Sequence, residues 1–187
     1  MSELNQLLSD IESAESTSLA RKDWNPKRHG SVDIRIGADG TWYHEGRAFQ
    51  RPALTKLFAS ALRREDDDYF LLTPAEKLSI QVDDAPFVAT LVEQIDDGEI
   101  RALVFTTNLG DRIIADEQHP IRVDIEPNSN QPRPYIHFRD GLEALIGRNA
   151  FFELVSMAST RECDGKLFFT ITSMGTEFIL GCADGDQ

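Results

Sequence analysis

The sequence predicts an α+β protein with largely antiparallel sheets, one helix packed in each of two units, and an additional N-terminal helix. Short runs of alternating apolar and polar residues are separated by turn residues, which is typical of antiparallel strands. Two longer stretches carry apolar stripes at helical spacing. A strand-helix-strand-strand order occurs twice. With 187 residues and 41% hydrophobic residues, the chain is long enough to bury a core.

The predicted organisation has three parts: a helix and arm over residues 1–23, a first α+β unit over 24–84, and a larger second unit over 85–187. The first helix rests on Leu4, Leu7, Leu8 and Ile11, which fall on one helical stripe. Residues 16–30 lack an apolar period and predict an arm or linker. The arm has a basic patch around a tryptophan, formed by Arg21, Lys22, Trp24, Lys27 and Arg28. This patch either docks on an acidic partner or folds back on the acidic body of the protein.

In the first unit, alternation over 32–36, the turn pair Asp39-Gly40 and strand formers over 41–44 predict a β-hairpin. Pro52 suits the first turn of a helix. That helix ends before the acidic turn 65–68. Its apolar stripe is formed by Leu54, Leu57, Phe58, Ala61 and Leu62. Strands follow over 69–73 and 78–82.

In the second unit, strands are expected over 87–95 and 100–107, joined through Asp97-Gly98, then over 113–114 and 121–125. Antiparallel meanders are the simplest topology for them. The three prolines of 127–134 predict a loop outside any ladder. A strand over 135–138, a helix over 142–158 and a hairpin of 167–172 with 177–180 complete the unit.

The two predicted helices suggest an internal duplication. A shift of 97 residues carries Arg51 onto Arg148, and further identities follow at the same shift. They pair Ala53 with Ala150, Leu57 with Leu154, Ala61 with Ala158 and Thr73 with Thr170. Fixed-period self-similarity is the signature of repeated structure.

The charge, the apolar runs and the cysteines of the chain restrict the classes of partner and cofactor that we expect. Lys and Arg total 19 and Asp and Glu total 32, a net charge of −13, which repels nucleic acid and anionic membranes. The acidic N-terminus and the absence of a run of about 18 apolar residues predict a cytoplasmic protein. Cys163 and Cys182 lack CxxC spacing, so neither a disulfide framework nor a zinc site is expected. No cofactor is indicated.

Five segments stand out within a stretch from about Trp24 to about Val155: DGTWYHEGRAFQRPALTKLFASALRRE, YFLLTPAEKLSIQVDDAPFVA, FTTNLGD, QHPIRV and RPYIHFRDGLEALIGR. Together they resemble domain-of-unknown-function family 1285, a group of uncharacterised bacterial proteins. The resemblance implies a two-part α+β molecule with repeated motifs and a proposed role in ligand binding or signal transduction. It supplies no established activity, cofactor or catalytic residue.

Two arginines are candidate anion ligands. Arg51 and Arg148 each stand at the start of a predicted helix, where a guanidinium beside free N–H groups can bind a carboxylate or phosphate. Alternatively, each pairs with a nearby acid, such as Glu45 or Asp140, and fixes the helix entry.

Two loops supply the other candidate ligand-binding residues. Thr73, Glu76 and Lys77 lie between two predicted strands and offer a hydroxyl, a base and a cation. Asn108 and Asp111 belong to the loop 107–111, whose backbone can aim N–H groups at an anion. The alternative for both loops is a structural turn.

Catalytic and metal signatures are absent. The histidines at 29, 44, 119 and 137 show no ligand spacing, and the run 66–68 lacks the Gly and Glu of a calcium loop. No GxSxG, GxxxxGK[ST] or GxGxxG motif occurs.

Three functions therefore remain. The first is a non-catalytic module that binds a small anionic ligand and has a regulatory or signal-transduction role. The second is an unfamiliar enzyme using Glu76, Lys77 or Asp111 in a cleft. The third is a protein-interaction adaptor or homo-oligomer that captures a partner through a sheet edge or apolar patch.

Overall fold

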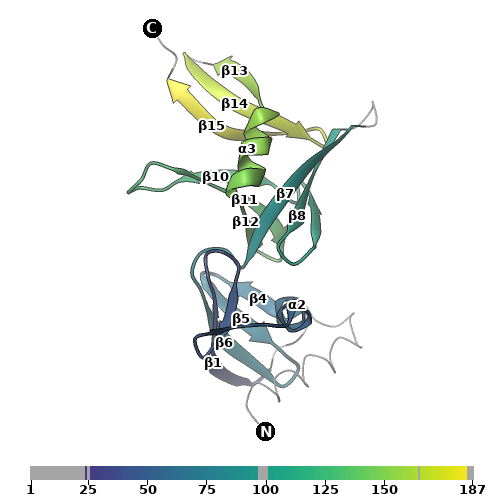
Figure 1. Ribbon diagram of the computed structural model, residues 1–187, viewed down its shortest axis with the longest axis vertical. Helices are drawn as coiled ribbons and strands as arrows, with labels where there is room; N and C mark the ends of the chain where they lie inside the picture. Colours follow the sequence, from purple (N-terminus) through teal and green to yellow (C-terminus); the bar gives the residue numbers. More distant parts are fainter. Residues whose placement is uncertain (1–23, 25, 97–100, 164, 185–187) are drawn as a thin grey trace. The chain divides into compact units, whose positions relative to one another are not determined.

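The computed structural model describes residues 24, 26–96, 101–163 and 165–184. The chain divides into two compact units, residues 1–86 and 87–187 (Figure 1). The predicted N-terminal helix lies outside the described residues, as does most of the predicted arm. Among the helices within these ranges, none has the length and hydropathy needed to cross a membrane.

Unit 1 is built on one six-stranded sheet with the strand order β3-β2-β1-β6-β5-β4. Two antiparallel meanders, β1 to β3 and β4 to β6, are joined by a parallel pairing of the first and last strands. The elements are β1 (Arg28–Ile36), β2 (Trp42–His44), β3 (Arg47–Ala48), α2 (Pro52–Ser60), β4 (Leu62–Glu65), β5 (Asp68–Leu72) and β6 (Glu76–Val82).

The predicted hairpin of β1 and β2 is confirmed, with Ile36 opposite Trp42. Its turn is closed by the Asp39 carboxylate, which accepts hydrogen bonds from the backbone N–H and the hydroxyl of Thr41, each at 2.9 Å. The bond from the Thr41 N–H is the main reason that the pKa of Asp39 is below its usual value. Gly40 follows with a φ of +78°, which glycine adopts without strain.

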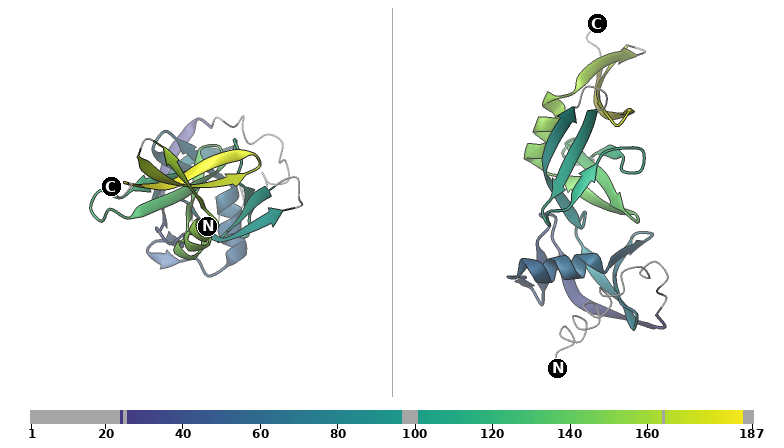
Figure 2. Two further views of the ribbon diagram at one scale, coloured as in Figure 1. Left: turned by 90° about the horizontal axis from the view of Figure 1, so that it is seen from above. Right: turned by 90° about the vertical axis from the view of Figure 1, so that its right-hand side faces the viewer.

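Helix α2 begins at Pro52 as predicted, because proline at the first position lacks an N–H that would have had no partner. It buries Phe58 and Ala59, and the Phe58 ring lies 6.4 Å from Trp42 and 5.6 Å from Phe49. Figure 2 shows α2 lying across one side of the unit 1 sheet. The predicted helical stripe was too long, since Leu62 is buried from strand β4 instead.

Unit 2 contains a second six-stranded sheet, in the order β10-β11-β12-β7-β8-β9. Its connectivity is that of the first sheet: two antiparallel meanders joined by parallel pairing of the first and last strands. Purely antiparallel meanders were predicted, so the parallel pairings of β1 with β6 and of β7 with β12 differ from the prediction. The strands are β7 (Phe87–Asp96), β8 (Arg101–Thr107), β9 (Arg112–Ile114), β10 (Ile121–Ile125), β11 (Pro132–Arg139) and β12 (Leu142–Ile146).

Helix α3 (Arg148–Ser156) follows β12 and packs beside β7 (Figure 1). A three-stranded sheet then forms from β13 (Ser159–Cys163), β14 (Lys166–Ser173) and β15 (Thr176–Asp184). Its hairpin is tied to the larger sheet by Ser173, whose hydroxyl accepts from the Leu103 N–H at 2.9 Å and donates to the Ala115 carbonyl at 2.6 Å. Ile171, Phe178 and Leu180 are buried beside it.

The predicted α+β class is wrong. Strands hold 58% of the described residues and helices 12%, so the molecule is mainly β, with two nine-residue helices added to three sheets. Part of the predicted helix 142–158 is strand β12, in which Leu142, Ala144 and Ile146 alternate as buried residues. A period of two, rather than 3.6, governs that segment, and the helix starts only at Arg148.

The predicted proline loop is also partly strand. Pro132 pairs with Ile125 and Pro134 with Val123 in the ladder of β10 and β11. Strand β12 pairs with β11 only from Tyr135 onward, so the two prolines stand on a stretch that needs no donor toward β12. Likewise the end of the predicted arm, Arg28 to Gly30, is part of β1 and pairs with β6.

The predicted duplication is not supported by the topology. The shift of 97 nearly superposes α2 on α3, but the strands after α2 belong to the same sheet as β1, whereas those after α3 form a separate sheet. What the two units share is the strand connectivity of their six-stranded sheets. The helices occupy different places in that scheme, since α2 lies between the meanders of its unit and α3 follows both.

Candidate functional site

The loop containing Thr73 is a structural turn. Thr73 is fully buried, and its hydroxyl accepts from the N–H groups of Ala75 at 3.2 Å and Glu76 at 3.0 Å. The same hydroxyl donates to the Glu76 carbonyl at 3.2 Å, and the Thr73 N–H donates to that carbonyl as well. Because both roles of the hydroxyl are used inside the turn, Thr73 has no capacity left for a ligand.

A second threonine closes the loop 107–111 in the same way. The Thr107 hydroxyl accepts from the Leu109 and Asp111 N–H groups at 3.3 and 3.1 Å and donates to the Asp111 carboxylate at 3.3 Å. Asn108 joins the loop to β7, since its side-chain oxygen accepts from the Val88 N–H at 3.1 Å. The contacts of Asn108 and Asp111 therefore shape the loop.

Glu76 and Lys77, predicted in the loop, are the first two residues of strand β6, and each forms an ion pair of its own. Lys77 forms an ion pair with Glu65 of β4, and its ammonium lies 4.0 Å from the centroid of the Phe70 ring. The Lys77 hydrogen bond lowers the pKa of Glu65 below its usual value. Glu76 pairs with Arg28 of β1 at 3.5 Å. Each candidate base or cation here already has a partner of opposite charge.

The two arginines of the anion hypothesis are exposed and lie in different units. Arg51 is the N-cap residue of α2, which has no side-chain cap, and Arg148 is the first residue of α3. Neither guanidinium has an ion-pair partner among the residues that the structure describes, so the alternative pairings with Glu45 and Asp140 are not formed. They do not converge on one site within a unit.

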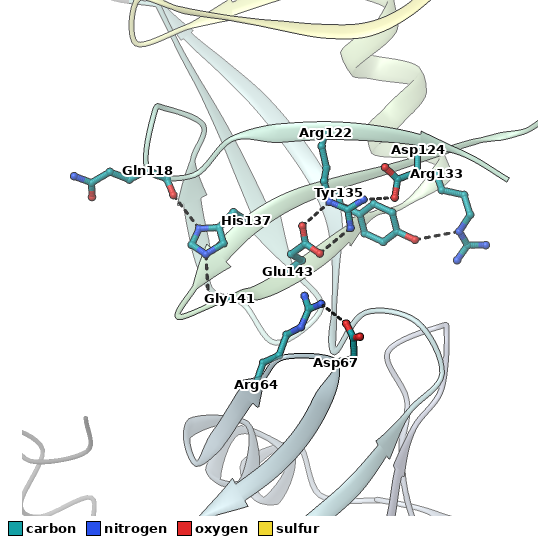
Figure 3. A network of polar contacts seen from close by, with 10 residues as sticks. All are labelled: Arg64, Asp67, Gln118, Arg122, Asp124, Arg133, Tyr135, His137, Gly141 and Glu143. Atoms are coloured by element: carbon teal, nitrogen blue, oxygen red, sulfur yellow. Dashed lines mark hydrogen bonds and ion pairs between the residues drawn. The ribbon is translucent and has the colours of Figure 1, made fainter. Parts of the chain in front are cut away.

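A polar network that the sequence did not suggest lies on β10, β11 and β12 (Figure 3). The Arg122 guanidinium donates to both carboxylate oxygens of Glu143, at 2.7 and 2.8 Å, and also to Asp124. It lies 4.1 Å from the centroid of the Tyr135 ring. The hydrogen bonds that Arg122 donates to Glu143 are the main reason that the pKa of Arg122 is above its usual value. We call this arrangement, in which Arg122 of β10 binds Glu143 of β12 across β11, the Arg122 clamp.

Two histidines stand at one end of that network. The His137 ring accepts from the Gly141 N–H at Nε2 and lies 2.8 Å from the Gln118 carbonyl at Nδ1, so Nδ1 carries the proton. His119 contacts Asp116 at 3.0 Å. Burial alone would raise the pKa of Asp116, but hydrogen bonds from His119 and Gln118 lower it overall. In the described ranges no cluster of His, Cys, Asp or Glu could hold a metal ion.

Exposed apolar side chains distinguish the two units. Within the described part of the chain, eight large hydrophobic residues are more than a third exposed, and all eight belong to unit 2: Leu91, Ile95, Ile114, Ile125, Phe152, Val155, Met174 and Ile179. The described part of unit 1 has none exposed to that degree. A contiguous patch of exposed apolar side chains marks an interaction site.

Three of the eight share one face of the larger sheet. In the ladders, Leu91 stands opposite Thr106 and Thr106 opposite Arg112, while Val104 stands between Glu93 and Ile114. Residues opposite each other point to the same side, and so do alternate residues of a strand. We call this set, Leu91, Glu93, Ile95, Arg112 and Ile114, the β7–β9 face. An ion pair of 3.5 Å between Arg112 and Glu93 crosses β8 on it.

The sequence contained a signal for this face. Strand β7 carries apolar residues in both phases, because Val92 is buried on one side while Leu91 and Ile95 are exposed on the other. An ordinary half-buried strand alternates apolar and polar residues. Leu91 and Ile95 therefore leave apolar surface exposed on the side of β7 that faces away from Val92.

Two protein-family models match the chain. The N-terminal domain model of DUF1285, a domain of unknown function, matches residues 21–85, and the C-terminal domain model matches residues 86–180. A crystal structure of a DUF1285 family protein from Silicibacter pomeroyi DSS-3 is 46% identical, with a TM-score of 0.76 and 84% of each chain covered.

A second DUF1285 family protein, from Shewanella baltica OS155, is 29% identical, with a TM-score of 0.53, and the match covers 66% of this chain and 90% of that one. No curated protein matches the chain. Because the two family models together span residues 21–180, the chain belongs to the DUF1285 family.

Proposed function

We propose that this protein is a non-catalytic protein-interaction module and that unit 2 contains its partner-binding surface. The observation that carries the proposal is that, among the residues that the structure describes, all eight exposed large apolar side chains belong to unit 2. Leaving such side chains in water costs free energy, which a partner recovers by covering them. The rest of the described surface has no comparable concentration.

The chemistry of the other candidate residues supports a non-catalytic role. A general base or nucleophile needs a free proton-accepting group beside the reacting atom. The Thr73 and Thr107 hydroxyls are used in turns, Lys77 is paired with Glu65, and Glu76 is paired with Arg28. Their contacts hold loops and strands in place.

Site-specific photo-crosslinking in cells tests this function. A benzophenone amino acid is placed at Leu91 or Phe152 in unit 2, and at Lys56 or Arg47, which are exposed residues of unit 1. We expect a discrete protein adduct from the unit 2 positions and at most one tenth of that yield from the unit 1 positions. Mass spectrometry of the adduct identifies the partner. Equal yields from both units, or no adduct from unit 2, would contradict the proposal.

A second candidate function is the binding of a small anionic ligand with a regulatory role. It is favoured by Arg51 and Arg148, two exposed guanidiniums at helix starts without an ion-pair partner in the described structure. Inorganic phosphate at about 100 times its dissociation constant would add about 2.7 kcal/mol of apparent stability. We then expect a thermal shift that Arg51→Ala or Arg148→Ala removes, whereas Lys56→Ala, the control, keeps it. A shift that persists in both arginine variants excludes this site.

A further inference from the structure

The imidazole ring of His137 contacts the turn that joins β11 to β12 (Figure 3). We propose that His137 is a pH-operated switch of this turn. The neutral ring holds the Gly141 N–H, whereas the protonated ring releases it and pairs with the Glu143 carboxylate. This inference goes beyond the proposed function, because the switch lies within unit 2 and works without a partner.

Both nitrogens of the neutral His137 ring are in use. Nδ1 lies 2.8 Å from the Gln118 carbonyl, which can only accept, so Nδ1 carries the proton. Nε2 is then the acceptor nitrogen, and the Gly141 N–H donates to it at 3.3 Å. The ring therefore joins the β11–β12 turn to the loop between β9 and β10.

Protonation removes the acceptor. Both nitrogens of an imidazolium are donors, so a protonated Nε2 would face the Gly141 N–H donor to donor and their hydrogen bond would break. The bond to the Gln118 carbonyl would remain, because Nδ1 keeps its proton. Histidine is the side chain whose charge changes between about pH 5 and about pH 8, and His137 is only partly buried, so solvent can supply the proton.

Glu143 is in place to receive the released Nε2–H. It stands opposite His137 in the ladder, and opposite residues have Cβ atoms about 5 Å apart on the same side of the sheet. Both Glu143 oxygens accept from Arg122, at 2.7 and 2.8 Å, but Arg122 also donates to Asp124. An imidazolium can thus take one oxygen of Glu143 while Arg122 keeps Asp124, and the Arg122 clamp loosens.

His119 is a second titratable group beside the switch, with its ring centroid 6.1 Å from that of His137. Its Nδ1 lies 3.0 Å from the Asp116 carboxylate, which accepts from a neutral or a protonated ring alike. Protonation of His119 therefore breaks no hydrogen bond to Asp116. Two charged rings at this distance repel each other, so the two titrations are coupled.

Two more charged residues follow His137 in the chain. The Arg139 guanidinium lies 5.1 Å from the centroid of Phe138 and 5.9 Å from that of Phe87, so it is placed against those rings. Asp140 is exposed in the turn and adds a negative charge three residues from His137. Neither residue supplies an acceptor that could replace Nε2 for the Gly141 N–H in the way a neutral imidazole does.

The test is nuclear magnetic resonance of the full chain between about pH 8 and about pH 5. Long-range nitrogen–proton spectra of the rings report the tautomer and charge of each histidine. Hydrogen exchange of the Gly141 amide, expressed as a protection factor, reports the turn, and the Arg122 Nε–H signal reports the clamp. His137→Gln is the locked variant, because glutamine offers an acceptor and donors at every pH. His119→Gln is the matched control, and the amide spectrum checks that both variants are folded.

We expect the Nδ1–H tautomer of His137 at the upper pH. As this ring gains its second proton, the Gly141 protection factor should fall at least about fivefold, since its hydrogen bond is lost. The Arg122 Nε–H signal should shift with the same midpoint. The His137→Gln variant should show neither change, and His119→Gln should show both.

The unmodified chain alone can overturn the proposal. An Nε2–H tautomer at the upper pH, or a Gly141 protection factor that follows His119 in place of His137, would do so. A constant Arg122 signal would rule out the exchange with Glu143 and with it the switch. The same fall in protection in His137→Gln would show that the turn opens for another reason.

Discussion

Replacing Ser173 by alanine is expected to lower the free energy of unfolding of unit 2 by about 2–4 kcal/mol. The Ser173 hydroxyl is fully buried and serves the Leu103 N–H and the Ala115 carbonyl at once. Alanine removes the hydroxyl and leaves both backbone groups in the core without a partner. The cost of two unsatisfied groups exceeds that of losing ordinary surface hydrogen bonds.

The measurement is urea unfolding followed by far-ultraviolet circular dichroism, with hydrogen exchange of the Leu103 amide as a local probe. We expect that amide to exchange at least tenfold faster in the variant. Thr172→Ala is the matched control, since Thr172 is the exposed neighbour on the same strand. If Ser173→Ala cost no more than this control, the two hydrogen bonds would not be what ties the β14–β15 hairpin to the larger sheet.

Replacing Phe58 by alanine is expected to destabilise unit 1 by about 3–5 kcal/mol. The ring is fully buried in the aromatic cluster with Trp42 and Phe49. Its loss leaves a cavity between α2 and the sheet, and the short helix cannot close it without losing other contacts.

Tryptophan fluorescence during urea unfolding isolates this effect, because both tryptophans, Trp24 and Trp42, belong to residues 1–86. Lys56→Ala, an exposed change in the same helix, is the control and should shift the midpoint little. A Phe58→Ala midpoint within error of that control would mean that α2 contributes little to the core of unit 1.

Local chemistry made parts of the fold predictable. The turn around Asp39 and the helix start at Pro52 depend on hydrogen bonds and backbone angles within a few residues, and both are confirmed. The strand over 142–146 could not be told from a helix, because its parallel partner β7 is far away in the sequence. The pairing of Pro132 and Pro134 with β10 likewise depends on where β12 ends, since Tyr135 is the residue of β11 nearest to them that pairs with β12.

The candidate site was less predictable than the fold. Thr73 and Asp111 were correctly placed in loops, but only the structure shows that their polar groups are satisfied by their own turns. The Arg122 clamp needs the register of three strands to bring Glu143 within reach. Whether Leu91 or Val92 is the buried neighbour depends on which side of β7 the core covers, and a β-bulge between Ala89 and Leu91 sets that phase.

The pairing of first and last strands has a consequence for biosynthesis. The strand made last in each six-stranded sheet, β6 or β12, occupies its centre and not its edge. While the chain emerges from the ribosome, β1 and β7 each keep one side of their backbone unpaired until nearly the whole sheet has been made. Such long-range closure is slow. A chain that ends before β6 or β12 would therefore leave the backbone of β1 or β7 without its partner strand. Such truncated forms would be prone to aggregation and to degradation by proteases.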